Sequence, residues 1–161
     1  MATSAIETQA QWAFAEHEHL DLVRGLNRLH DVAGEIGHRP AAELSVHLLG
    51  ILEWLDVVLR PHIAWEDAWL YPEIDARAGT PWATRAARFD HQQIREMEAR
   101  LVADRPLVTS RPSAEQRAEI RCHLFGLEAL LRAHIEREER YLLPLLEEDR
   151  TPGQPRFDRP S

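Results

Sequence analysis

The chain has one cysteine, no long apolar run and no excess of basic residues, and each absence excludes a class of protein. A single cysteine, Cys122, cannot form an internal disulfide and suits a reducing compartment. No apolar stretch reaches the ~18 residues needed to cross a bilayer. The start, Met1–Thr8, lacks the basic and apolar segments of a secretory signal. We therefore expect a cytoplasmic protein with no membrane partner.

Familiar catalytic motifs are also missing. The sequence contains no H-E-x-x-H motif, no glycine-rich phosphate loop and no G-x-S-x-G motif. The ferritin-like di-iron arrangement, with a Glu-x-x-His motif on each of two helices, is absent as well, because this spacing occurs only at Glu16-x-x-His19 and Glu35-x-x-His38. The net charge is −8 at pH 7, so the surface would repel the phosphates of nucleic acid, and we expect no nucleic-acid partner.

The length and composition are those of one globular domain. The chain has 161 residues, of which 44% are hydrophobic and 29% are charged, enough for a sizeable core. We expect this domain to cover residues 1–150. Residues 151–161 contain three prolines, and we expect them to form a disordered tail.

Apolar residues spaced by alternating steps of three and four predict four long helices. The expected helices run from about Gln9 to Ile36, from Ala41 to Tyr71, from just after Pro81 to Ala103, and from Ser113 to Glu148. Gly37 ends the first, Pro72 and the turn at Gly79-Thr80-Pro81 close the second, and Ser113 with Gln116 resembles a capping box at the start of the fourth. Short loops make consecutive helices antiparallel. The predicted fold class is all-α, an up-down-up-down four-helix bundle.

The most informative pattern is a repeat at an interval of 72 residues. The identical residues with this separation include His19 and His91, His62 and His134, Glu66 and Glu138, and Pro72 and Pro144. In each predicted helix, a histidine occupies a position in the apolar stripe. In the second and fourth helices, a glutamate follows four residues later. A duplicated helix hairpin that contributes these side chains to a shared interior is the simplest explanation.

Buried carboxylates and imidazoles destabilise a fold unless they have partners, and a cation can serve them all. Residues four apart lie ~6 Å apart along one helix face and can reach one centre. Four imidazoles and two carboxylates overfill a tetrahedral zinc site, but they suit two ions that the carboxylates bridge. Nitrogen and oxygen donors without thiolate fit iron or manganese. The candidate metal ligands are His19, His62, Glu66, His91, His134 and Glu138.

Other chemically interesting residues are assigned structural roles. Trp69 and Tyr141, each three residues after a glutamate, are expected to be walls of the core. Pro61 should bend the second helix one residue before His62. The remaining histidines are expected to lie outside the metal centre: His17, His30, His38, His47 and His123.

Several segments resemble the hemerythrin-like (HHE cation-binding) family, a four-helix bundle with a non-haem di-iron centre. They are Glu18-His19-x-x-Leu22, Pro61-His62-x-x-x-Glu66-x-x-x-Leu70-Tyr71-Pro72, Asp90-His91-x-x-Ile94 and His134-x-x-x-Glu138-Glu139-x-x-Leu142-Leu143-Pro144. The resemblance covers roughly residues 16–148. It implies that the six candidates bind two oxo- or hydroxo-bridged iron ions, with Glu66 and Glu138 bridging; iron is favoured over manganese or zinc.

The sequence departs from the oxygen-carrying members of that family at two positions. They have a second histidine one turn after the third-helix ligand, where this chain has Arg95. Their fourth-helix acid is an aspartate five residues after its histidine, whereas Glu138 follows by four. Fewer nitrogen ligands leave open metal positions, which favours reaction with peroxide or NO over reversible oxygen carriage.

These observations lead to one main hypothesis and three alternatives. We expect a protein that binds or senses O2, NO or peroxide at a di-iron centre. The first alternative is a di-iron enzyme that disproportionates peroxide or reduces NO, and the second is an iron storage or delivery protein. The third is a helical interaction module with unusual core histidines.

Overall fold

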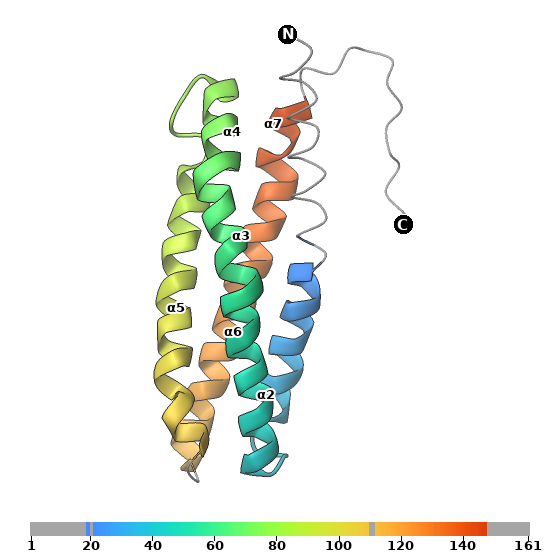
Figure 1. Ribbon diagram of the computed structural model, residues 1–161, viewed down its shortest axis with the longest axis vertical. Helices are drawn as coiled ribbons and strands as arrows, with labels where there is room; N and C mark the ends of the chain where they lie inside the picture. Colours follow the sequence, from blue (N-terminus) through green and yellow to red (C-terminus); the bar gives the residue numbers. More distant parts are fainter. Residues whose placement is uncertain (1–18, 20, 110–111, 148–161) are drawn as a thin grey trace.

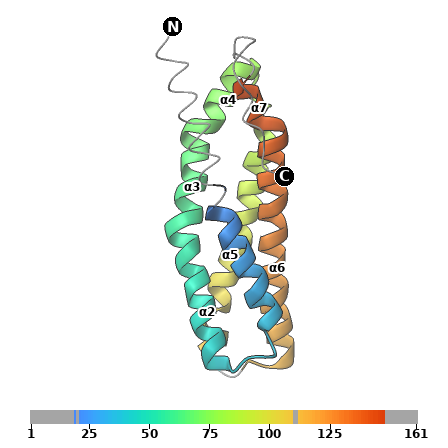
Figure 2. The same cartoon turned by 90° about the vertical axis from the view of Figure 1, so that its right-hand side faces the viewer.

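The described residues form a bundle of long helices that stand side by side. The computed structural model describes residue 19 and residues 21–109 and 112–147. Within these ranges the chain forms four helical rods and contains no β-strand (Figure 1). The view turned by 90° also shows the rods aligned along the long axis (Figure 2). The predicted all-α bundle is confirmed.

The four rods follow the chain in order. The first is helical over residues 21–35. The second comprises α2 (Ala41–Trp54), η1 (Leu55–Leu59), α3 (Arg60–Trp65), η2 (Glu66–Leu70) and α4 (Tyr71–Ala78). The third is α5 (Arg85–Thr109). The fourth comprises α6 (Ala114–Arg137), η3 (Glu138–Leu142) and α7 (Pro144–Glu147). The predicted start at Gln9, the predicted end at Glu148 and residues 151–161 lie outside the described residues.

Two predicted helix boundaries are confirmed in detail. The first rod ends at residue 35, just before the turn that contains Gly37. At the start of α6, the Ser113 hydroxyl accepts the backbone N–H of Gln116 at 3.2 Å. The Gln116 side chain accepts the backbone N–H of Ser113 at 2.8 Å, which completes the capping box.

Two predicted helix ends are wrong, because a proline does not stop the helix at either place. The second rod continues through Pro72 to Ala78, where Gly79 ends it in a left-handed conformation with φ 66°. The third continues through Pro106 to Thr109. Before Pro106, the buried Asp104 carboxylate lies 2.6 Å from Nδ1 of His123 on α6. This contact ties the end of α5 to its neighbour.

A wider helical turn precedes each of three prolines. The segments η1, η2 and η3 have i→i+5 hydrogen bonds and end two residues before Pro61, Pro72 and Pro144, respectively. In η2, for example, the Tyr71 N–H donates to the Glu66 carbonyl. A proline ring clashes with the carbonyl four residues earlier, and a wider turn accommodates it without ending the helix. Each such turn holds one extra residue and therefore changes which later side chains face the core.

The first rod lies against α2 without space for an additional methyl group. A Cβ built on Gly25 would lie 2.0 Å from Cε2 of Trp54, so only glycine permits this approach. The other rods are joined by contacts between α2 and α5, between α5 and α6, and between α4 and α7. Together these contacts enclose one continuous interior.

A polar layer divides the apolar core into two clusters. The larger cluster includes Leu55, Ile94 and Leu127, and the smaller one includes Tyr71, Ile74, Ala87 and Leu142. Along the second, third and fourth rods, buried histidines and glutamates lie where one cluster gives way to the other. The polar layer is therefore an interior feature of the bundle.

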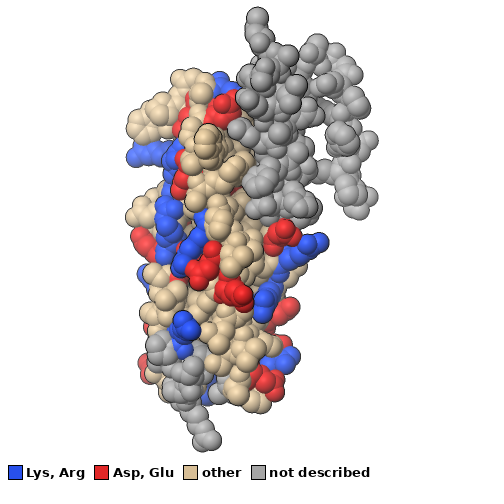
Figure 3. Space-filling model, viewed as in Figure 1, with Lys and Arg blue, Asp and Glu red and all other residues tan. Residues whose placement is uncertain are grey.

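The outer surface carries charges of both signs. Figure 3 shows acidic and basic side chains interspersed over the visible face of the bundle. Among the described residues, no helix combines the length and apolar character that crossing a bilayer requires.

Candidate metal centre

The structure brings all six candidate ligands together in the polar layer. The second, third and fourth rods each contribute one histidine, His19 lies two residues before the described start of the first rod, and the second and fourth rods each add a glutamate. None of the six has more than 2% of its surface exposed: His19, His62, Glu66, His91, His134 and Glu138. The predicted convergence of these side chains is thus observed.

The two carboxylate oxygens of Glu66 face different pairs of histidines. Oε1 lies 2.8 Å from Nε2 of His62 and 3.8 Å from Nε2 of His19. Oε2 lies 3.1 Å from Nε2 of His91 and 3.7 Å from Nε2 of His134. The two oxygens of one carboxylate thus face two separate pairs of histidines.

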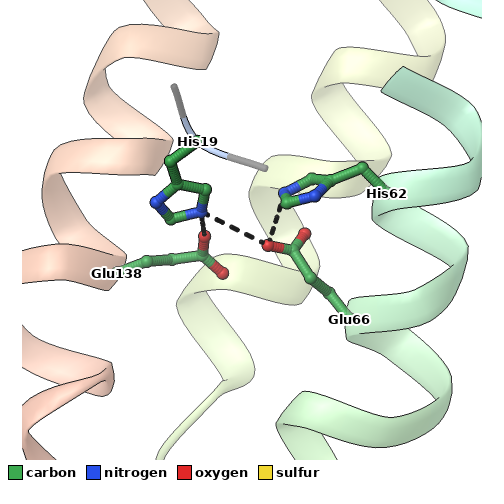
Figure 4. A group of neighbouring side chains, drawn as sticks. All are labelled: His19, His62, Glu66 and Glu138. Carbon is green, nitrogen blue, oxygen red and sulfur yellow. Dashed lines mark ion pairs between the residues drawn. The ribbon is translucent and has the colours of Figure 1, made fainter. Parts of the chain in front are cut away.

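Glu138 approaches the same two pairs through a single oxygen. Its Oε2 lies 3.2 Å from Nε2 of His19 and 3.5 Å from Nε2 of His134. Its Oε1 accepts a hydrogen bond from the Tyr71 hydroxyl. Figure 4 shows the Glu138 carboxylate beneath His19 and the Glu66 carboxylate beneath His62, with ion pairs from His19 to both glutamates and from His62 to Glu66. The two glutamates are therefore not equivalent, although their positions in the sequence repeat are.

Two groups of four donors in the polar layer could each hold a metal ion. One consists of His19, His62, Glu66 and Glu138, and the other of Glu66, His91, His134 and Glu138. Within each group, the nearest ligand atoms lie within 4.8 Å of one another. The two groups share both glutamates. The histidine pair of the first group comes from the first half of the sequence repeat, and the pair of the second group comes from the second half.

The cluster has strongly perturbed ionisation. Burial lowers the pKa of His19, but the nearby carboxylates of Glu138, Glu139 and Glu66 outweigh it and raise the pKa to about 11. Burial raises the pKa of Glu66, yet hydrogen bonds from the surrounding histidines lower it well below 4.5. The buried carboxylate therefore stays ionised and attracts positive charge. Metal ions can take the place of the protons on these histidines.

Several polar atoms in the layer fit a metal site better than a hydrogen-bonded network. Nε2 of His19, Oε1 of Glu66 and Oε2 of Glu138 are buried and make no hydrogen bond of acceptable geometry to any described residue. Buried polar atoms without partners each cost about 1–3 kcal/mol. All three point toward the shared interior, where coordination to a cation would satisfy them. The donor set, four imidazoles and two carboxylates, fits such ions chemically.

The aromatic residue beside the centre is Tyr71, and not the residues that the sequence pattern indicated. Trp69 is 64% exposed and Tyr141 is 62% exposed, so the prediction that they are core walls is wrong. Tyr71 is fully buried, with its hydroxyl 3.1 Å from Nε2 of His91. The wider turn of η2 is the reason, because it places residue i+5 on the face that i+4 normally occupies. Pro72 was the available signal for that turn.

Three further acids lie next to the outer nitrogens of the cluster. Oδ1 of Asp67 lies 3.0 Å from Nδ1 of His91, and Oε1 of Glu139 lies 3.5 Å from Nδ1 of His19. Oδ2 of Asp90 lies 3.6 Å from Nδ1 of His134. Carboxylates in such positions commonly orient ligating histidines. Asp67 and Glu139 are 72 residues apart and each follows a candidate bridging glutamate, a signal that the sequence already contained.

The remaining described histidines belong to neither group of four. Nδ1 of His30 lies 3.1 Å from Glu128, and Nδ1 of His47 lies 3.1 Å from Glu35. His123 contacts Asp104, as described above, and His38 is exposed. His17 lies outside the described residues.

Comparison with known proteins agrees with this geometry. A family model described as the hemerythrin HHE cation binding domain matches residues 12–146. No curated protein and no solved structure matches the chain. The matched range includes all six buried ligand candidates. The chain therefore belongs to the hemerythrin HHE cation-binding domain family.

Proposed function

We propose that this protein holds two iron ions in the polar layer and uses them to bind or sense dioxygen, NO or peroxide. One observation carries the proposal: two groups of four buried donors share Glu66 and Glu138. A single ion would leave half of the histidines without a function. Two ions divide the six side chains evenly and account for the buried polar atoms that lack hydrogen bonds.

The proposed ligands are one histidine pair for each ion together with the shared glutamates. His19 and His62 would hold one ion, and His91 and His134 the other. Imidazole and carboxylate donors without thiolate are typical of iron or manganese sites. When bound, iron supplies Lewis acidity and electrons toward small oxygen- or nitrogen-containing ligands. Four protein donors leave room for such a ligand in each coordination sphere.

The surrounding residues position the donors and keep water away. The Tyr71 hydroxyl donates to Glu138 and thereby fixes the orientation of that carboxylate. The Tyr71 ring stacks on the His91 ring with centroids 5.2 Å apart. Apolar clusters lie on both sides of the polar layer. A small uncharged ligand suits this interior better than a large or highly charged one.

Optical spectroscopy tests the proposal. The protein is loaded anaerobically with two equivalents of Fe(II), and its absorption is recorded before and after exposure to air, NO or peroxide. We expect a new charge-transfer band with at least one of these ligands, and its absence in a His62→Ala variant with unchanged helical content. A protein that binds two irons but stays colourless and inert with all three ligands contradicts the proposed function.

The position of Tyr71 favours a second candidate, turnover of peroxide. The sequence pattern showed no proton-donating group beside the ligands, whereas the structure places a buried hydroxyl there. Such a group can donate a hydrogen bond to a reacting oxygen. Steady release of O2 from peroxide, lowered in Tyr71→Phe at unchanged iron content, supports an enzyme. Binding without turnover supports a sensor or carrier.

A further inference from the structure

The outer nitrogens of the histidines distinguish the two candidate metal positions. In the His91–His134 pair, Nδ1 of His91 donates to Oδ1 of Asp67 at 3.0 Å, within the range of a good hydrogen bond. With this proton on Nδ1, Nε2 of neutral His91 presents its lone pair to the centre. His91 thus has the tautomer and orientation that metal coordination requires.

Asp67 is itself held in place from the third rod. Its Oδ2 accepts from Nη1 of Arg95 at 3.4 Å, while Nη1 of Arg88 lies 3.6 Å from Oδ1. The Arg88 guanidinium also lies over the Tyr71 ring, 5.1 Å from its centroid. The Asp67 carboxylate is therefore fixed between two arginines and a buried imidazole.

The other pair has a matching acid with a weaker contact. Glu139 follows Glu138 as Asp67 follows Glu66, and it faces Nδ1 of His19 across 3.5 Å. The contact does not have the geometry of a hydrogen bond, since Nδ1 of His19 forms none with any described residue. Glu139 is also more exposed than Asp67, with 47% of its side chain accessible against 31%. An acid is thus present at both positions of the repeat, but the contact from Glu139 to His19 is longer than the contact from Asp67 to His91.

In the His91–His134 pair, the second histidine also faces an acid at its outer nitrogen. Nδ1 of His134 faces Asp90 at 3.6 Å, and Asp90 also pairs with Arg137. His91 and His134 lie with their Nε2 atoms 3.3 Å apart, so they converge on one point. The His19 and His62 rings are edge-to-face with centroids 5.4 Å apart.

We propose that the two metal positions retain their ions unequally: the ion at His91 and His134 is held tightly, and the ion at His19 and His62 exchanges readily. Asp67 is the positioning residue that creates the difference. The inference rests on the proposed function, because it requires two bound ions. Partners that orient a metal-binding histidine typically contribute 10–100-fold in metal affinity, so roughly that ratio is expected between the positions.

The experiment measures how fast each ion leaves. Protein loaded with two equivalents of Fe(II) is mixed under anaerobic conditions with excess ferrous chelator, and coloured complex is followed in time. We expect two phases of one ion each, with rates that differ by about 10-fold or more. Asp67→Asn should accelerate the slow phase by about 10–100-fold, whereas Glu139→Gln should affect the fast phase alone.

Two further variants keep the result interpretable. Glu136→Gln, at an exposed acid on the same helix as His134, serves as the matched control and should leave both phases unchanged. His19→Ala should bind one ion and release it at the wild-type slow rate, which assigns that phase to the His91–His134 position. Helical content by circular dichroism confirms that each variant is folded.

Specific results would overturn the inference. They are release of both ions in a single phase, a slow phase that Asp67→Asn leaves unchanged, or a slow phase that Glu139→Gln accelerates as much. Should Asp67→Asn fail to fold, loss of the slow phase in His19→Ala overturns it equally. Failure of the proposed function appears differently, as wild-type protein that binds fewer than two irons before any chelator is added.

Discussion

Replacing Glu66 with glutamine removes the anion that the two candidate metal positions share. Glu66 is fully buried, and its oxygens lie 2.8 Å from His62 and 3.1 Å from His91. Glutamine has nearly the same shape, so the packing of the layer should persist. The substitution removes one negative charge and gives one arm of the side chain N–H donors, which cannot bind a cation.

The size of the effect follows from linkage between metal binding and folding. A ligand at 100 times its Kd stabilises the folded state by about 2.7 kcal/mol, so two ions contribute about 5 kcal/mol. In a chain of this length, each kcal/mol shifts Tm by about 2–4 °C, which gives a rise of about 10–20 °C with metal. For Glu66→Gln we expect a rise below about 5 °C, because one position loses its oxygen ligand and the other keeps only an uncharged amide oxygen.

The assay is thermal unfolding followed by circular dichroism, with and without two equivalents of Fe(II) under anaerobic conditions. Glu53→Gln, at an exposed acid on the same rod, is the control and should show the wild-type rise. An equal rise in the wild type and Glu66→Gln would mean that the shared carboxylate contributes nothing to metal binding, contrary to this prediction.

Three further predictions concern packing, hydrogen bonding and pH. Gly25→Ala should destabilise the fold by about 1–3 kcal/mol, because its Cβ would lie 2.0 Å from the Trp54 ring; Gly34→Ala, which meets nothing within 4 Å, should not destabilise it. Tyr71→Phe should lower the free energy of unfolding by about 1.5–3 kcal/mol through loss of a hydrogen bond to a carboxylate, measured by urea unfolding. The pKa of Glu66 lies well below 4.5 in the folded protein, so ionised Glu66 should stabilise the metal-free protein above pH 4.5. This stabilisation should be lost as the pH falls through the pKa of Glu66 in the folded state, and a free energy of unfolding that stays constant in acid contradicts this.

Much of the fold and the ligand set follows from periodicity in the sequence. Apolar residues at steps of three and four lie on one helix face, which predicted the four helices. The 72-residue interval matched each histidine and glutamate of the first hairpin with one of the second. His19 and His91 could be paired in this way without any knowledge of tertiary structure. The capping box at Ser113 was equally local, since a hydroxyl and an amide three residues apart suffice.

The errors share one physical cause, the treatment of proline as a helix end. Proline lacks an N–H, but a wider turn or a tertiary contact lets the helix continue. At Pro72 the wider turn changed the register, which buried Tyr71 and exposed Trp69. At Pro106 the contact between Asp104 and His123 holds the end of α5, and a pairing between distant residues cannot be read from local sequence.

Anomalous diffraction at the iron absorption edge shows directly whether the buried donors share two cations. For crystals of the iron-loaded protein, the account predicts two peaks per chain, one beside His19 and His62 and the other beside His91 and His134, with Glu66 between them. A single peak, or peaks located outside the polar layer, would contradict it.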